Sequence, residues 1–243
     1  MRRERVELGE RDLKIFELIK KMGWVRQDDI AYYLGLDYED SKVNIIIRGI
    51  GFRLQKHGYI IKKRFIVGYP SYWCFTKLGV ESYGGIAEPK FVLQNIKHDS
   101  FVTRLLIEML QKNTLEVKTE FELKHEIVFD KNNSKNKKIK IPDLAVGNVA
   151  IEVELTQKNL ARINAIIREY RLGKYEQVIY YTTNAIAKLM SNITEGDGKF
   201  KYKIIDELDI NKSTDFISSH NNLSGGYSKE KQDLRDWFRG VGG

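Results

Sequence analysis

The chain has 243 residues, of which 42% are hydrophobic and 30% charged, so it holds enough apolar side chain for a folded core. One cysteine excludes a disulfide framework, no apolar stretch approaches the roughly 18 residues that span a bilayer, and the charged first residues lack the apolar run of a secretory signal, so we expect a cytoplasmic protein without a membrane segment. The net charge of +8 at pH 7 favours an anionic partner.

The segment 1–82 predicts a winged helix-turn-helix, which is three helices followed by a β-hairpin. Apolar residues at helical spacing indicate the helices, and apolar runs around a Gly-Tyr-Pro turn indicate the strands. Asp40 or Ser41 is expected to cap the third helix, while Gly49 and Gly51 lower its helical propensity. The predicted helices cover 10–22, 26–36 and 40–58, and the predicted strands cover 59–67 and 71–76.

Basic residues are concentrated on the third helix and the hairpin. No acidic residue occurs between Asp40 and Glu81, whereas eight lysines and arginines do. In a winged helix the third helix enters the major groove and the hairpin contacts the backbone, so a double-stranded DNA partner is predicted. A solvated charged face, or a winged helix that docks to a protein, is the alternative. The predicted DNA-binding residues are Lys42, Arg48, Arg53, Lys56, Lys62, Lys63 and Arg64.

A second unit is predicted over 91–208, after a linker at 83–90 that carries two glycines and a proline. Its elements follow the order αβββαβαβ, so the fold class is α/β (α+β) with a mixed sheet. Residues 131–140 are interpreted as an exposed loop, and 209–243 as a polar tail with a short helix around Trp237 and Phe238. The predicted helices are 95–113, 156–173 and 185–193, and the predicted strands are 115–123, 142–146, 147–155, 175–183 and 200–206.

Three carboxylates interrupt the apolar stretch 141–155, IPDLAVGNVAIEVEL. Glu152 and Glu154 would share one face of a strand, where two like charges repel unless a cation lies between them. A tight turn after Gly147 would bring Asp143 alongside. Three oxygen ligands at one point suit Mg²⁺ or Mn²⁺, so we predict a metal site formed by these three residues. An edge hairpin with a solvated acidic face is the alternative.

The spacing of these residues is similar to a nuclease signature. Pro142-Asp143, followed after eight residues by Glu152-x-Glu154, resembles the PD-(D/E)xK motif of restriction-endonuclease-like nucleases. The resemblance implies a fold of helix, three strands, helix and strand, in which Asp143 and Glu152 bind the metal. A lysine two residues later would activate the attacking water, and Glu154 stands at that position here. Lys158, at the start of the next helix, is the candidate to replace the lysine.

A winged helix followed by such a domain resembles the replication-relaxation family of plasmid proteins, including the MobC-type relaxases. YWCFTKLG at 72–79 and His98-Asp99 at the start of the next helix are further parallels. The resemblance implies metal-dependent, site-specific nicking of plasmid DNA at an origin of transfer, which starts conjugative mobilisation. It also implies accessory relaxosome and coupling proteins as partners.

Two further residues are candidates for the site. His98 could position a phosphate or act as an acid, although a capping or surface role explains it equally well. Tyr170 could be a nucleophile, since many relaxases attack DNA with a tyrosine, although apolar packing also explains it. Two other functions stay open: a catalytically inactive DNA-binding regulator of plasmid replication or transcription, and a dimeric nuclease that makes double-strand breaks.

Overall fold

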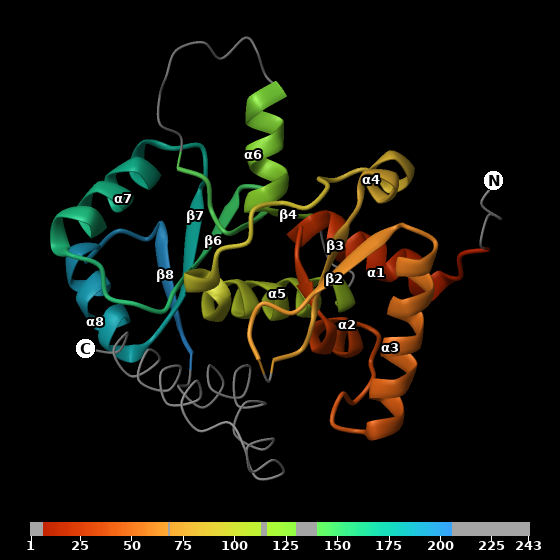
Figure 1. The fold of residues 1–243 in the computed structure, drawn as a ribbon. Helices are drawn as coiled ribbons and strands as arrows, with labels where there is room; N and C mark the ends of the chain where they lie inside the picture. Colours follow the sequence, from red (N-terminus) through yellow and green to blue (C-terminus); the bar gives the residue numbers. More distant parts are fainter. Residues whose placement is uncertain (1–6, 68, 113–115, 130–139, 206–243) are drawn as a thin grey trace.

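The computed structural model of the chain describes 7–67, 69–112, 116–129 and 140–205, and for 127–129 the backbone alone. The predicted tail 209–243 with its short helix, and the predicted loop 131–140 up to its last residue, lie outside the described residues. Figure 1 shows a small sheet in the N-terminal half and a larger one in the C-terminal half. In the described part, no helix is both long and apolar enough to cross a membrane.

The first half contains three helices and a β-hairpin in the predicted order. Asp40 caps α3 as predicted, since its carboxylate accepts a hydrogen bond from the backbone N–H of Lys42 at 2.8 Å. The strands are shorter than predicted because the hairpin connection turns inward and buries Ile66 and Tyr69 against Ile96. The elements, whose strands pair in the order β1-β3-β2, are α1 (Glu10–Met22), β1 (Val25–Arg26), α2 (Gln27–Tyr33), α3 (Ser41–Lys56), β2 (Ile60–Lys63) and β3 (Tyr72–Phe75).

A short helix that the sequence did not predict follows β3. It is α4 (Lys77–Tyr83), and the hydroxyl of Thr76 caps it by accepting a hydrogen bond from the N–H of Gly79 at 3.1 Å. A Cβ on Gly79 would lie 2.2 Å from the carbonyl oxygen of Tyr59, so the close approach of α4 to the hairpin requires glycine. Helix α4 therefore occupies the end of the predicted winged helix and the first residue of the predicted linker.

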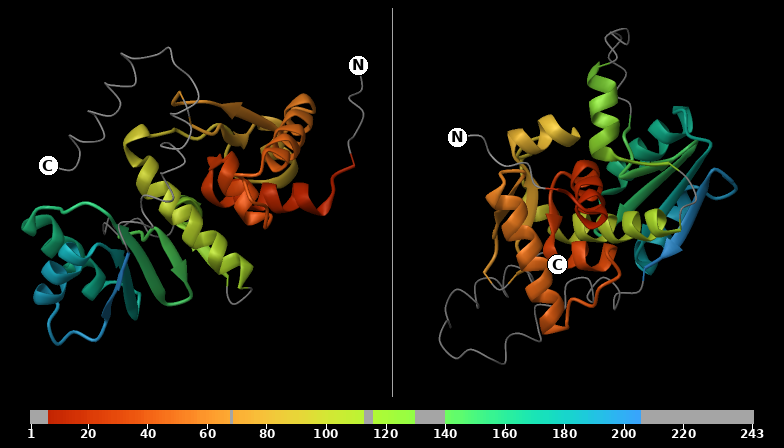
Figure 2. Two further views of the ribbon diagram at one scale, coloured as in Figure 1. Left: turned by 90° about the horizontal axis from the view of Figure 1, so that it is seen from below. Right: turned by 90° about the vertical axis from the view of Figure 1, so that its right-hand side faces the viewer.

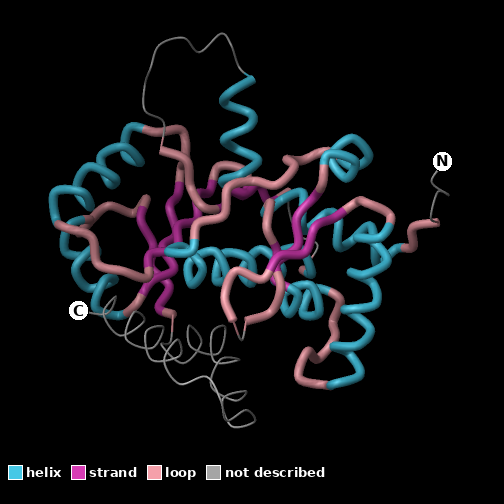
Figure 3. Tube along the Cα trace, in the orientation of Figure 1, coloured by secondary structure: helices cyan, strands magenta, loops and turns pink. Residues whose placement is uncertain are grey.

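The second half is a five-stranded mixed sheet in the order β4-β5-β6-β7-β8, and the fold as a whole is α+β. The first three strands pair antiparallel, and β6, β7 and β8 pair parallel. Figure 3 shows these strands in magenta, separate from those of the small sheet. The elements are η1 (Leu93–Asn95), α5 (Ile96–Gln111), β4 (Val117–Thr119), α6 (Glu120–Phe129), β5 (Leu144–Val146), β6 (Val149–Glu154), α7 (Leu160–Leu172), β7 (Gln177–Thr182), α8 (Asn184–Ile193) and β8 (Phe200–Ile204).

The predicted strand at 115–123 is wrong over most of its length. The chain is extended only at β4 and then forms α6. Thr119 and Glu122 cap that helix reciprocally: the hydroxyl of Thr119 accepts from the N–H of Glu122 at 3.2 Å, and the carboxylate of Glu122 accepts from the N–H of Thr119 at 3.0 Å. This Thr-x-x-Glu capping box starts a helix, and it outweighs the alternating apolar pattern that indicated a strand.

Helices cover both faces of the larger sheet. Helix α5 packs on the face that carries Ile151 and Val153, and α7 and α8 pack on the face that carries Ala150 and Val178. Figure 2 shows α5 between the larger sheet and the N-terminal half. The apolar side chains of α5 consequently belong to one continuous core, which also contains Trp73 of the small sheet. The predicted linker thus lies between the two sheets in the sequence, but one hydrophobic core contains side chains from both sides of it.

Candidate functional site

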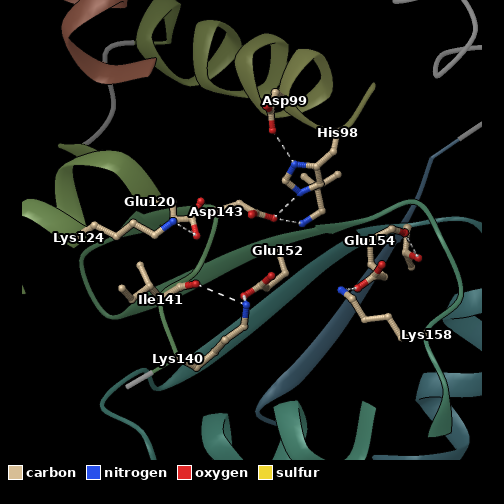
Figure 4. Close-up of polar contacts among 12 residues, drawn as sticks. His98, Asp99, Glu120, Lys124, Lys140, Ile141, Asp143, Glu152, Glu154 and Lys158 are labelled. Atoms are coloured by element: carbon tan, nitrogen blue, oxygen red, sulfur yellow. Dashed lines mark hydrogen bonds and ion pairs between the residues drawn. The ribbon is translucent and has the colours of Figure 1, made fainter. Parts of the chain in front are cut away.

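The hairpin of β5 and β6 positions the predicted acidic residues. Its tight turn lies at Gly147, whose φ of +54° is a conformation that glycine adopts without strain. Leu144 pairs with Ile151, so Asp143, one residue earlier, lies opposite Glu152, one residue later. The predicted approach of Asp143 to the Glu-x-Glu strand is therefore present, and Figure 4 shows the two carboxylates beside each other.

Asp143 is held by α5 and by the neighbouring strand. Its Oδ2 accepts a hydrogen bond from the backbone N–H of Val153 at 2.7 Å and lies 3.1 Å from Nε2 of His98. The other ring nitrogen of His98 lies 3.1 Å from a carboxylate oxygen of Asp99. Burial alone would lower the pKa of His98, but the two carboxylates outweigh it and raise the pKa to about 10. His98 thus contacts the acidic centre, as the sequence suggested.

The carboxylate of Glu152 contacts α7. The hydroxyl of Tyr170 donates a hydrogen bond to its Oε1, and Nζ of Lys140 lies 2.9 Å from the same oxygen. Burial and the charge of Asp143 raise the pKa of Glu152 to about 7. Burial and the charge of Glu152 raise the pKa of Tyr170, so its hydroxyl stays protonated. The structure therefore brings the candidate Tyr170 into the acidic centre.

Lys140 is a site residue that the sequence analysis missed. It is the last residue of the Lys- and Asn-rich stretch at 131–140, and its charge was assigned to an exposed loop. In the structure the charge of Glu152 raises the pKa of Lys140 despite burial. Its position two residues before Pro142-Asp143 is the signal that could have identified it.

Glu154 is paired separately from Asp143. It forms an ion pair with Lys158, and both border a small pocket that Glu152, Ile163 and Met190 also line. Same-face neighbours on a strand are separated by roughly 6.6 Å, and the side chain of Glu154 pairs with Lys158, which lies in the segment before α7 and not in the helix as predicted. Figure 4 shows this pair apart from Asp143. Lys158 is accordingly a partner of Glu154 and not of the Asp143 centre.

The described residues do not form a ready three-ligand metal site, and the metal site stays a prediction. Among the described residues, no three His, Cys, Asp or Glu side chains lie where they could hold a metal ion. The reason is that a different basic side chain pairs with each carboxylate: His98 with Asp143, Lys140 with Glu152, and Lys158 with Glu154. In this arrangement the carboxylates of Asp143, Glu152 and Glu154 do not converge on one point.

The predicted DNA-binding residues fall into two groups. Arg48 and Arg64 lie near Tyr38: burial raises the pKa of Tyr38, and the charges of both arginines lower it by a smaller amount. Burial and the charge of Arg48 also lower the pKa of Lys62, so these two cations are close neighbours. Within the described part of the chain, none of the three forms an ion pair with an acid. Lys42 and Lys56 are exposed at the two ends of α3.

Arg53 and Lys63 have intramolecular partners instead. Arg53 forms a 2.6 Å ion pair with the buried Asp12 and so ties α3 to α1. The Nζ atom of Lys63 lies 3.2 Å from Oε2 of Glu88 and 5.7 Å from the ring centroid of Trp24. Of the seven predicted residues, Arg53 and Lys63 are therefore paired with acids of the protein, and only the partner of Arg53 is buried.

Comparisons with family models, with curated proteins and with solved structures gave no match. The resemblance to plasmid relaxases thus stays a prediction from short motifs. Functional assignment depends on the arrangement of the residues described above.

Proposed function

We propose that the protein binds duplex DNA through the exposed face of α3 and the adjoining hairpin. The supporting observation is the cluster of Arg48, Lys62 and Arg64: the charges of Arg48 and Lys62 repel each other, Arg48 and Arg64 both lie near Tyr38, and none of the three forms an ion pair with an acid in the described part. DNA phosphates neutralise such a cluster and release their counterions, which favours binding. The helix α3 contains no acidic residue, so its whole exposed face is compatible with a polyanion.

The same face carries apolar side chains between the basic ones. Ile45 is 70% exposed and Phe52 is 67% exposed, and both point away from the core of the small sheet. Apolar side chains on a major-groove helix contact the methyl group of thymine, whereas phosphate contacts carry no sequence information. We therefore assign affinity to the basic cluster and any sequence preference to the exposed side chains of α3.

The test is a binding titration with a fluorescently labelled duplex over a range of salt concentrations. Arg48→Ala with Arg64→Ala should weaken binding and reduce the slope of log affinity against log salt by about 1.8, or about 0.9 per lost phosphate contact. Arg162→Ala with Arg168→Ala removes the same charge from the exposed face of α7 and should change neither quantity. Equal affinity and slope for the first pair and wild type would contradict the proposal.

Strand cleavage at the acidic centre is a second candidate function. The observation that favours it is the adjacency of Asp143 and Glu152, with Lys140 beside them; burial and the charge of Asp143 raise the pKa of Glu152 to about 7. A divalent metal ion bound by two such carboxylates would activate water and neutralise the charge that develops on a phosphodiester. The sharper form of this proposal is nicking at a plasmid origin of transfer, and its alternative is a regulator that binds DNA without cutting it.

Supercoiled plasmid carrying the protein's own origin region separates these functions, with Mn²⁺, Mg²⁺ or EDTA present. A nickase should give open circles that require metal and are lost in Asp143→Ala. Glu154→Gln is the matched control, because Glu154 pairs with Lys158 away from Asp143 and its change should leave nicking intact. Linear product would indicate a double-strand nuclease. Equal DNA binding without cutting, also with accessory proteins added, would support the regulator.

A further inference from the structure

A cavity of about 310 Å³ lies between the two halves of the molecule. Trp24 and Tyr72 line it from the first half, Phe91 from the connecting segment, and His98, Phe121 and Asp143 from the second half. Ligand sites for small molecules typically have volumes of roughly 300–1,000 Å³ and lie between structural units. The cavity is thus large enough for one nucleotide, and it opens beside the Asp143 centre.

One wall of the cavity is a cluster of aromatic rings. The ring centroid of Phe91 lies 5.8 Å from that of Trp24 and 4.8 Å from that of Tyr72. Phe65, from the connection of the β2–β3 hairpin, stacks on Phe91 at 3.7 Å with an angle of 7° between the rings. Aromatic side chains of this kind stack with unpaired bases regardless of sequence. The cluster also connects the cavity to the hairpin that we propose contacts DNA.

The hydroxyl of Tyr72 points to a polar ligand. Tyr72 is only 5% exposed and lines the cavity, yet its hydroxyl has no hydrogen-bond partner among the described residues. A buried hydroxyl without a partner is unfavourable, and a ligand atom, an ion or a water in the cavity would satisfy it. The exocyclic oxygens and amino groups of a nucleobase are suitable partners.

The opposite side of the cavity favours a phosphate. Asn95 and Ile96, at the start of the 16-residue helix α5, line the cavity, and the N-terminus of a helix carries a partial positive charge. Lys90 lines it as well and is exposed, without an ion pair to any described acid. The acids on the lining already have cationic partners; these pairs are Asp29 with Arg104, Glu120 with Lys124, and Asp99 and Asp143 with His98.

We propose that this cavity binds one unstacked nucleotide, with its base against the aromatic cluster and Tyr72 and its phosphate at the start of α5 beside Lys90. The inference rests on the proposed DNA-binding function for the source of the nucleotide, which is a strand held by α3 and the hairpin. A free mononucleotide has the same chemistry and is the other source. In either case the phosphate lies on the side of the cavity that holds His98 and Asp143.

The test measures binding of thymidine monophosphate and of a short oligothymidylate to the full chain by titration calorimetry. Tyr72→Phe should weaken binding about fivefold, since one hydrogen bond is lost, and Lys90→Ala should weaken it by at least as much. Tyr180→Phe and Lys188→Ala are the matched controls. The hydroxyl of Tyr180 is likewise buried without a partner among the described residues, and neither control residue lines the cavity. Neither control should change binding.

The outcomes separate the two sources and the two proposals. If both ligands bind and Tyr72→Phe weakens the binding of both, the cavity accepts a free nucleotide. If only the oligonucleotide binds and is weakened, the cavity accepts a nucleotide that belongs to a strand. Binding of neither ligand, or binding that ignores both Tyr72→Phe and Lys90→Ala, overturns the cavity assignment. Failure of duplex binding in the Arg48 and Arg64 experiment would leave nucleotide binding by the cavity intact, so the two proposals fail separately.

Discussion

Gly49 and Gly51 lie two residues apart in α3 and have different surroundings. A Cβ on Gly51 would lie 2.4 Å from the indole ring of Trp73, so the helix approaches β3 closely only because this side chain is absent. Gly49 lies on the exposed side, with nothing within 4 Å of such an atom. Both glycines reduce helical propensity equally in the sequence, but only one of them is required by packing.

Alanine substitutions at these two positions should therefore have opposite effects. Gly49→Ala should raise the free energy of unfolding by about 1 kcal/mol, because alanine loses less backbone entropy in a helix. Gly51→Ala should lower it by about 1–3 kcal/mol, because the ring of Trp73 must move. Urea unfolding followed by circular dichroism measures both changes. Equal changes of the same sign would show that α3 does not pack on Trp73 as described.

The residues of the acidic centre were predicted from the sequence in part. The turn at Gly147 follows from local chemistry, and it places Asp143 opposite Glu152. The partners of these carboxylates could not be predicted, because they depend on which helix covers which face of the sheet. His98 reaches Asp143 from α5, whereas Lys140 reaches Glu152 from the end of a lysine-rich stretch in which no single lysine is distinctive.

Helices α2 and α5 meet through buried charges. Arg26 forms ion pairs with Asp28 at 2.8 Å and with Asp29 at 3.1 Å, and Arg104 of α5 lies 2.6 Å from Asp29 and 3.5 Å from Asp28. Asp28 and Asp29 are both almost fully buried. Burial raises the pKa of Asp28, while the charges of Arg26 and Arg104 oppose that effect. Two arginines are thus needed to keep two buried acids charged.

Removing one of these arginines should be costly. Arg104→Ala should lower the free energy of unfolding by about 3–5 kcal/mol, since it leaves two buried acids that share the single cation Arg26. Without Arg104 the pKa of Asp28 in the folded state rises further, and a raised pKa makes stability fall as pH rises. The deficit relative to wild type should accordingly be larger at pH 8 than at pH 5. Arg168→Ala, on the exposed face of α7, should stay within about 0.5 kcal/mol at both pH values.

Most elements were predicted correctly where one local signal dominated, as at the cap of α3 or the alternating burial of β7. The failure at α6 arose where two local signals competed. The segment following Val117 alternates apolar and polar residues like a strand, but Thr119 and Glu122 satisfy the first backbone donors of a helix. Periodicity alone does not rank these signals, because the free energy of a cap depends on geometry that forms only in the helix.

At the scale of the whole molecule, the continuous core makes the two halves one cooperative unit. Side chains of α1 and β3 share it with α5 and with Leu144, Ile151 and Val153 of the larger sheet. The sequence could not reveal this, because residues 83–90 have the composition of a linker whether or not the units on either side pack together. Mutations in the second half should consequently destabilise the first.

Ile151→Ala tests this coupling. It should lower the free energy of unfolding by about 2–5 kcal/mol, and the shift should be equal for far-ultraviolet circular dichroism and for the fluorescence of Trp24 and Trp73 in the first half. Two of the three tryptophans report on that half. If the halves unfolded separately, the fluorescence transition would stay in place while the circular dichroism transition split.

A polypeptide that ended near residue 82 would keep α3 and the hairpin but lose α5. The apolar faces of α1 and α2 carry Ile15, Leu18 and Ile30. They would then be exposed to water, because the core would lack Leu105 and Leu106 of α5. Exposed apolar patches of that kind favour aggregation. The proposed DNA-binding surface therefore depends on α5, and a recombination event that moved it to another gene would have to carry α5 with it.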